Sequence, residues 1–134
     1  MTYVPCNRPA TGPTPWCQLA LADLAALDPA GRSLGCYNPR RVRGRSGPWS
    51  LHACGRAVDW RSADRRRGWE VARWVAWFGH TDIQLIIFDG QQWGGRFNRG
   101  WVPFQGPDPH YDHIHIESRV AVPTVHITTG APVN

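Results

Sequence analysis

The sequence contains no lysine, no long hydrophobic run and none of the cysteine patterns that bind structural metals. The segment IQLIIF at 83–88 has only the length of a β-strand, so we expect no membrane-spanning segment. The four cysteines, Cys6, Cys17, Cys36 and Cys54, fit no CxxC zinc pattern. Zinc-finger spacing, an RNP-like run and a basic region followed by heptads are also absent, so we expect no specific nucleic-acid binding.

The N-terminal segment MTYVPCNRPATGP lacks the charged and apolar regions of a secretory signal peptide. Three explanations stay open: the protein acts in the cytosol, it leaves by lysis or another route, or the sequence is a domain of a longer secreted chain. The cysteines do not decide between them. One disulfide among Cys6, Cys17 and Cys36 fits the sequence as well as buried free thiols do.

At 134 residues, the chain is expected to fold as one domain and to act as a monomer. We expect an irregular leader over 1–13, a motif-bearing core over about 30–127 and a frayed tail over 128–134. The net charge of +5 favours polyanionic partners such as nucleic acid, membrane surfaces or anionic cell-wall polymers. The arginines concentrate at 39–45 and 64–69, and we interpret both clusters as a solvated face rather than a binding patch.

Two helices are predicted. The first covers 14–28, with Thr14 as its N-cap and Pro15 at its first position. The second covers 62–79, where Gly79 is a plausible stop. Its apolar stripe consists of Trp69, Ala72, Val75 and Ala76.

Short strands are predicted around Asp59 and over 82–90, 113–118 and 121–127, the last of them an edge strand because of its proline. Residues 29–49 read as loop with one short strand, and 91–109 as a long loop or loose hairpin. The fold class is therefore α+β, with a small antiparallel sheet flanked by helices.

The run DHIHI at 112–116 carries the first candidate ligands. Because successive side chains on a strand alternate between faces, His113 and His115 project together, while Ile114 and Ile116 face the core. Asp112 can join the imidazoles only if it lies at the strand entry, where the pleat is not yet enforced. This run therefore predicts two histidines that look into a cleft.

The run SLHACGRAVDW at 50–60 supplies the second set. Gly55 allows a bend that a Cβ would obstruct, and this bend separates a loop with His52 from a strand with Asp59. Single histidines are more often surface or core residues, but two such runs together favour one metal site. Two imidazoles and one carboxylate, with an open position for water, are typical of a catalytic zinc. The HExxH motif of zincins is absent.

The two runs together resemble a known family. The pattern Ser50-x-His52-x-x-Gly55-x-Ala57-x-Asp59, followed by Asp112-x-x-His115, is similar to that of the D-Ala-D-Ala carboxypeptidases and L-alanyl-D-glutamate endopeptidases. These LAS-type zinc peptidases have the hedgehog/DD-peptidase fold. The ending HYDHIHI looks most like the peptidase domains of phage endolysins and actinobacterial cell-wall proteins. The resemblance covers roughly residues 30–118.

The resemblance implies a role for each matched residue. His52, Asp59 and His115 would bind Zn²⁺, Asp112 would be the general base, and His113 would donate to the oxyanion. The substrate would be an amide bond of a peptidoglycan stem peptide. An Asp at the catalytic position, where carboxypeptidases usually have Glu, favours an endopeptidase. The protein would then be a phage endolysin or a cell-wall remodelling domain that acts on the bacterial wall.

Other residues receive weaker expectations from their positions. We expect Ser50 to support the first motif, Arg43 or Arg45 to match a substrate-binding arginine, and Cys54 to point away from the metal. We expect His110 to be a gate or surface residue rather than a ligand, and His80 and His126 to be structural or exposed. Core packing and a substrate-lining wall are equally open for four tryptophans, Trp49, Trp60, Trp93 and Trp101.

Two other function classes stay open. The first is a non-catalytic, zinc-stabilised binding module of the same fold, against which the presence of Asp112 argues. The second is a nucleic-acid-binding protein or nuclease that uses the arginine clusters. It ranks last, because the clustered carboxylates of a two-metal nuclease are missing.

Overall fold

The computed structural model describes residues 3–42, 48–94 and 100–134. Both predicted helices are confirmed, as α1 (Pro15–Leu27) and α2 (Arg65–Phe78). The side chain of Thr14 caps α1 by accepting a hydrogen bond from the backbone N–H of Cys17, and Gly79 ends α2. Neither helix, nor any other in the described part of the chain, is long and apolar enough to cross a bilayer.

Six strands form one sheet in the order β1-β2-β6-β3-β4-β5, and every neighbouring pair is antiparallel. The strands are β1 (Arg32–Gly35), β2 (Ala57–Arg61), β3 (Ile83–Phe88), β4 (Gln91–Gly94), β5 (Trp101–Pro103) and β6 (Ile114–Ser118). The segment 91–109, predicted as a loop or loose hairpin, contributes the antiparallel pair of β4 and β5. The α+β class with a small antiparallel sheet is thus confirmed.

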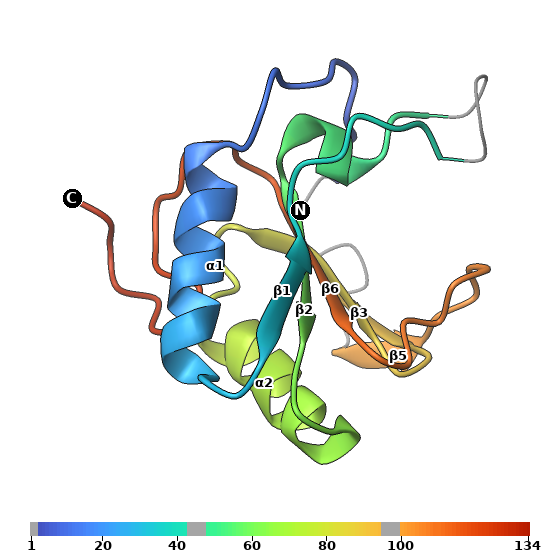
Figure 1. Ribbon diagram of the computed structural model, residues 1–134, viewed down its shortest axis with the longest axis vertical. Helices are drawn as coiled ribbons and strands as arrows, with labels where there is room; N and C mark the ends of the chain where they lie inside the picture. The colour runs from blue at the N-terminus through green and yellow to red at the C-terminus, as the bar shows by residue number, and fades with distance from the viewer. Residues whose placement is uncertain (1–2, 43–47, 95–99) are drawn as a thin grey trace.

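Both helices pack on one face of the sheet (Figure 1), and the main core lies between the helices and the sheet. Ile114 and Ile116 are fully buried there, as the alternation of DHIHI predicts. Val58 and Trp60 of β2 point to the same core. The alternate residues of these strands, which include Asp59 and His115, therefore face away from the helices, where they can form a site.

The strand predicted over 121–127 does not form, and this expectation was wrong. The backbone N–H groups of Thr124 and Val125 donate to the carboxylate of Asp82 rather than to a neighbouring strand. The tail that we expected to fray is also tied down. Val133 N–H donates to the Thr124 carbonyl, and Thr128 is buried. Side-chain bonds that the apolar pattern does not reveal thus replace the expected ladder.

All four cysteines are paired, as Cys6–Cys54 and Cys17–Cys36. The Cα–Cα distances of 5.8 and 6.1 Å are ordinary for disulfides. The alternative of buried free thiols was therefore wrong. Cys54 points away from the predicted ligands, as expected, because its sulfur is bonded to Cys6.

Candidate metal centre

The sheet register brings two predicted ligands face to face. Asp59 of β2 pairs directly with His115 of β6, which in turn pairs with Ile87 of β3. Residues opposite one another in antiparallel strands project to the same side, with Cβ atoms about 4.5–5.5 Å apart. The two runs, separated by about fifty residues in sequence, therefore meet on the sheet face that carries no helix.

A short 3₁₀ helix, η1 (Leu51–Cys54), delivers the third predicted ligand. Ser50 caps η1 by accepting a hydrogen bond from the backbone N–H of His52 at 3.2 Å, so it supports the first motif as expected. Gly55 ends η1 with φ 63°, a left-handed conformation that favours glycine. A Cβ there would also lie 2.5 Å from the Thr14 side chain. The bend predicted at Gly55 thus turns the chain from His52 into β2.

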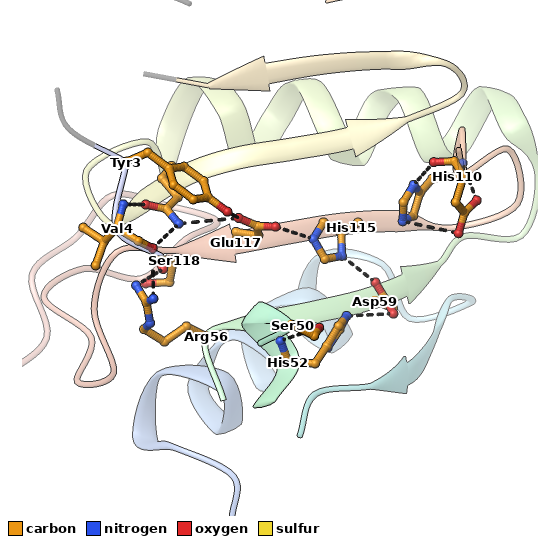
Figure 2. Close-up of polar contacts among 12 residues, drawn as sticks. Tyr3, Val4, Ser50, His52, Arg56, Asp59, His110, His115, Glu117 and Ser118 are labelled. Atoms are coloured by element: carbon orange, nitrogen blue, oxygen red, sulfur yellow. Dashed lines mark hydrogen bonds and ion pairs between the residues drawn. The ribbon is translucent and has the colours of Figure 1, made fainter. Parts of the chain in front are cut away.

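Three ligand atoms converge at this point (Figure 2). His52 Nε2 lies 3.1 Å from Asp59 Oδ2, and His115 Nδ1 lies 3.0 Å from Asp59 Oδ1. One ligand atom from each of these three residues lies within 4.8 Å of the other two. His52 Nδ1 is 2.8 Å from the Cys36 carbonyl, which can only accept, so this nitrogen carries the hydrogen and Nε2 faces Asp59. Two imidazoles and a carboxylate are a donor set that suits Zn²⁺.

The electrostatics of the site favour a cation. Burial works against the charge of Asp59, but its contacts with His115 and His52 outweigh burial and hold the Asp59 pKa well below its ordinary value. Burial likewise works against a charged His115 ring, yet its contacts with Asp59 and Glu117 raise the His115 pKa to about 9. The two carboxylates that contact the His115 ring thus favour positive charge at this point.

The predicted catalytic pair lies at the entrance to β6. His113 Nδ1 is 2.8 Å from the carboxylate of Asp112, and its Nε2 is 3.9 Å from Asp59 Oδ1. Asp112 itself points outward, with 67% of its side chain exposed. It lines a neighbouring hollow of about 170 Å³ together with Arg61 and Tyr111. The pKa of Asp112 is lowered, and the largest cause is the hydrogen bond from His113. Asp112 thus contacts the site only indirectly, through its hydrogen bond with the His113 ring.

His110 belongs to the site more closely than its position in the sequence suggested. Its ring centroid is 4.8 Å from that of His113 and 5.2 Å from that of His115. Its φ of 56° is unusual for a residue other than glycine. Burial, followed by the neighbouring charge of His115, lowers the pKa of His110. His110, His113 and Asp59 also form a second group of ligand atoms within 4.8 Å of one another.

These residues line a cleft of about 610 Å³. Its lining also includes Tyr3, Arg40, Trp49 and Phe104. Such a volume lies in the range of ordinary ligand pockets. Arg43 and Arg45, the arginines that we expected to match a substrate-binding residue, lie outside the described residues.

Of the four tryptophans left open, Trp49 lines this cleft and the others pack elsewhere. Trp60 is buried in the core and donates to Asp28, whereas Trp93 packs against the same core and Trp101 packs on Trp69. The remaining histidines have no place in the cleft. His80 is exposed, and His126 contacts the Asp23 carboxylate at 3.0 Å, so both expectations are confirmed.

A comparison with family models decides the family. The model described as VldE, C-terminal domain, matches residues 10–115, which is well over half of the chain. The chain belongs to the VldE C-terminal domain family. The range matched by this family contains His52, Asp59, Asp112 and His113 and ends at His115. No curated protein and no solved structure matches the chain significantly.

Glu117 is a residue of the site that the sequence pattern did not single out. This residue is buried on the same face of β6 as His115, and its Oε2 lies 2.8 Å from His115 Nε2. The signal was available, because alternation in HIHIE gives Glu117 the same parity as both histidines. Burial raises and the bond from His115 lowers the pKa of Glu117, and the net shift is downward. Glu117 is therefore a charged neighbour of the candidate metal centre.

Proposed function

We propose that the protein is a zinc-dependent peptidase that hydrolyses an amide bond in peptidoglycan stem peptides, and that its fold is of the hedgehog/DD-peptidase type. The observation that carries this proposal is the convergence of His52, Asp59 and His115 in the lining of the cleft. A purely structural zinc site is usually closed by four protein ligands, whereas this set offers three and leaves an approach from the cleft.

In this proposal, His52 Nε2, Asp59 and His115 Nδ1 hold the metal. A zinc ion bound by such a set acts as a Lewis acid that activates water and polarises the carbonyl of the amide. The cleft walls bind and orient the peptide. His113, whose Nδ1–H donates to Asp112, takes a proton from the water at its Nε2 and gives it to the leaving amine. His110 packs against the rings of His113 and His115 and restricts their movement.

The disulfides support a place of action outside the cytosol. Disulfides persist in oxidising surroundings and are rare in cytosolic proteins. With Cys6 joined to Cys54 and Cys17 to Cys36, the chain suits the bacterial cell wall better than the reducing cytosol. The positive net charge is compatible with the anionic polymers found there.

Digestion of purified peptidoglycan tests the proposal. We expect soluble fragments with new amine termini, detected by mass spectrometry, from the zinc-loaded protein and none after chelation and dialysis. Restoring one equivalent of Zn²⁺ should restore release, and the mass of the fragments identifies the bond. An intact wall, with stoichiometric zinc still bound, would contradict a peptidase and favour the non-catalytic module.

A double-mutant cycle tests whether Asp112 and His113 act as one unit. Asp112→Ala and His113→Ala should each lower turnover by about 10²–10⁴-fold, the usual contribution of acid–base catalysis, while zinc content stays unchanged. Because the Asp112 carboxylate bonds His113 Nδ1 at 2.8 Å, the double variant should lose no more than the worse single variant.

The measurement is turnover with bound zinc determined in parallel. Losses that multiply in the double variant would show two independent roles, with Asp112 as base and His113 as oxyanion donor, as the resemblance alone implies.

A further inference from the structure

Glu117 is the carboxylate that contacts the candidate ligand His115 from the side away from Asp59. It lies on β6, two residues after His115, and is 6% exposed. Its register partner on β2 is Ala57, whose methyl group leaves space on that side. Figure 2 shows Glu117, His115 and Asp59 in a row, with the imidazole between the two carboxylates. The distances are 2.8 Å from Nε2 to Glu117 Oε2 and 3.0 Å from Nδ1 to Asp59 Oδ1.

The other oxygen of Glu117 is held from two directions. Tyr3 Oη donates to Oε1 at 2.7 Å, and Gln84 Nε2 approaches the same oxygen at 3.4 Å. Tyr3 belongs to the N-terminal segment, whereas Gln84 belongs to β3. Both oxygens are thus committed, so the carboxylate cannot rotate away from His115 without losing bonds that hold its far side.

The N-terminal segment that carries Tyr3 is itself fixed. Gln84 bonds the backbone of Val4 through both ends of its amide, at 2.8 and 3.0 Å. The buried guanidinium of Arg56 donates to the carbonyls of Val4 and Pro5 at 2.9 and 2.8 Å. Next to these residues, Cys6 is joined to Cys54 of η1. Glu117 therefore rests in a rigid frame built from residues far apart in sequence.

This frame has a consequence for metal binding. A neutral imidazole carries one N–H, and a metal takes the other nitrogen, so whatever accepts the N–H decides which nitrogen becomes the ligand. Only Nδ1 of His115 faces Asp59 and His52. Left without Glu117, the ring could place its hydrogen on Nδ1 and turn its lone pair away from the site.

We propose that Glu117 is a positioning residue that holds His115 by its Nε2–H and thereby presents Nδ1 to the metal. The proposal rests on the proposed function only in assuming a metal at His52, Asp59 and His115, and not on the bond that is cut. Glu117 does not bind the metal itself, because His115 lies between them.

The test measures zinc affinity by competition with a chromophoric chelator. Glu117→Ala should weaken zinc binding about 10–100-fold, the usual effect of losing a carboxylate behind a ligating histidine. Glu117→Gln keeps an oxygen that accepts the Nε2–H and should lose less than about tenfold. Asp82→Asn is the matched control, since Asp82 is also buried and hydrogen-bonded but lies away from the cleft, and it should leave zinc affinity unchanged.

Nitrogen-15 NMR of the His115 ring separates positioning from mere structural support. In the zinc-loaded protein, Nε2 should carry the hydrogen and Nδ1 the metal, and Glu117→Gln should retain this pattern. Glu117→Ala should give a mixture of ring states. Should Glu117→Ala fail to fold, Tyr3→Phe removes one bond to the carboxylate and should weaken zinc binding measurably, by up to about tenfold.

The outcomes separate this inference from the proposed function. Wild-type zinc affinity in Glu117→Ala, or in Tyr3→Phe where the alanine variant does not fold, would overturn the role of Glu117 alone. Zinc binding that depends on Glu117, with no digestion of peptidoglycan, would overturn the proposed function alone. Absence of zinc binding by the unaltered protein would overturn both.

Discussion

Asp59→Ala is expected to cause a larger loss of zinc binding than any other single substitution in the cleft, and peptidase activity should fall with it. Asp59 is the residue shared by both neighbouring imidazoles, with Oδ2 at 3.1 Å from His52 and Oδ1 at 3.0 Å from His115. A four-ligand structural zinc site has an apparent binding free energy of about 10–16 kcal/mol, which is about 2.5–4 kcal/mol for each ligand. Losing Asp59 should therefore weaken zinc binding by at least about 10²–10³-fold.

Asp59→Ala also leaves the two histidines without a negative charge between them. The rings of His52 and His115 are 5.2 Å apart and both are buried, so a divalent cation there meets no countercharge on this side. The change should thus reduce affinity beyond the loss of one bond. Zinc content after dialysis and digestion of peptidoglycan are the two measurements, made on the same preparation.

Asp89→Asn provides the matched control for Asp59→Ala. Asp89 is a partly buried carboxylate that bonds Arg65 and Trp69 at 2.6 and 2.9 Å, outside the cleft. Its removal should reduce stability and leave zinc content at one per chain. Wild-type zinc affinity in Asp59→Ala would mean that the metal binds elsewhere, and the candidate metal centre would have to be abandoned.

Local alternation explains why part of the site was predictable from the sequence. In HIHIE, the isoleucines mark the core side, so the direction of His115 follows from the buried neighbours Ile114 and Ile116. In the first run, glycine at the bend and alanine on the face of Asp59 identify a strand that enters from a turn. The meeting of the two runs then requires only that β2 and β6 pair, which they do.

The unpredicted part depends on contacts between distant segments. Tyr3 bonds Glu117 across 114 positions, and no periodic pattern can link an N-terminal tyrosine to a strand near the other end. The cysteine pairing has the same origin, since four cysteines allow three pairings and the sequence does not choose between them. His110 reaches the cleft through a left-handed backbone conformation, which residue type alone does not reveal.

The strand predicted over 121–127 failed for a related reason. Valine and isoleucine favour strands only where another strand offers a ladder. Here the buried carboxylate of Asp82 takes the backbone N–H groups of Thr124 and Val125, and β3 pairs with β4 and β6 instead. A polar side chain from another segment thus outcompeted the local preference.

Reduction of both disulfides is expected to bring the metal-free protein close to unfolding. Cys6–Cys54 spans 48 positions and Cys17–Cys36 spans 19. Restricting the unfolded chain over such loops stabilises the fold by about 4 and about 3 kcal/mol, respectively. A domain of this size has a free energy of unfolding of only about 5–15 kcal/mol, so losing both bonds removes half of it or more.

Urea unfolding of the chelated protein, with and without reductant, measures this loss through the shift of the midpoint. The two single-pair variants, with Cys6 and Cys54 or Cys17 and Cys36 replaced by alanine, separate the two contributions. An unchanged midpoint in reductant, with the reduction of both bonds confirmed by mass, would contradict the expected stabilisation. Four reactive thiols in the untreated protein would contradict the pairing itself.

Zinc affinity should distinguish the two disulfides even though their effects on stability are similar. Cys6–Cys54 joins the segment of Tyr3 to η1, which carries His52, so its removal loosens a metal ligand and the anchor of Glu117 together. Cys17–Cys36 joins α1 to the end of β1, where the Cys36 carbonyl accepts from His52. The Cys6/Cys54 variant should therefore lose more zinc affinity than its Cys17/Cys36 counterpart. Equal losses of zinc affinity in the two variants would mean that the N-terminal segment stabilises the fold but does not position the metal ligands.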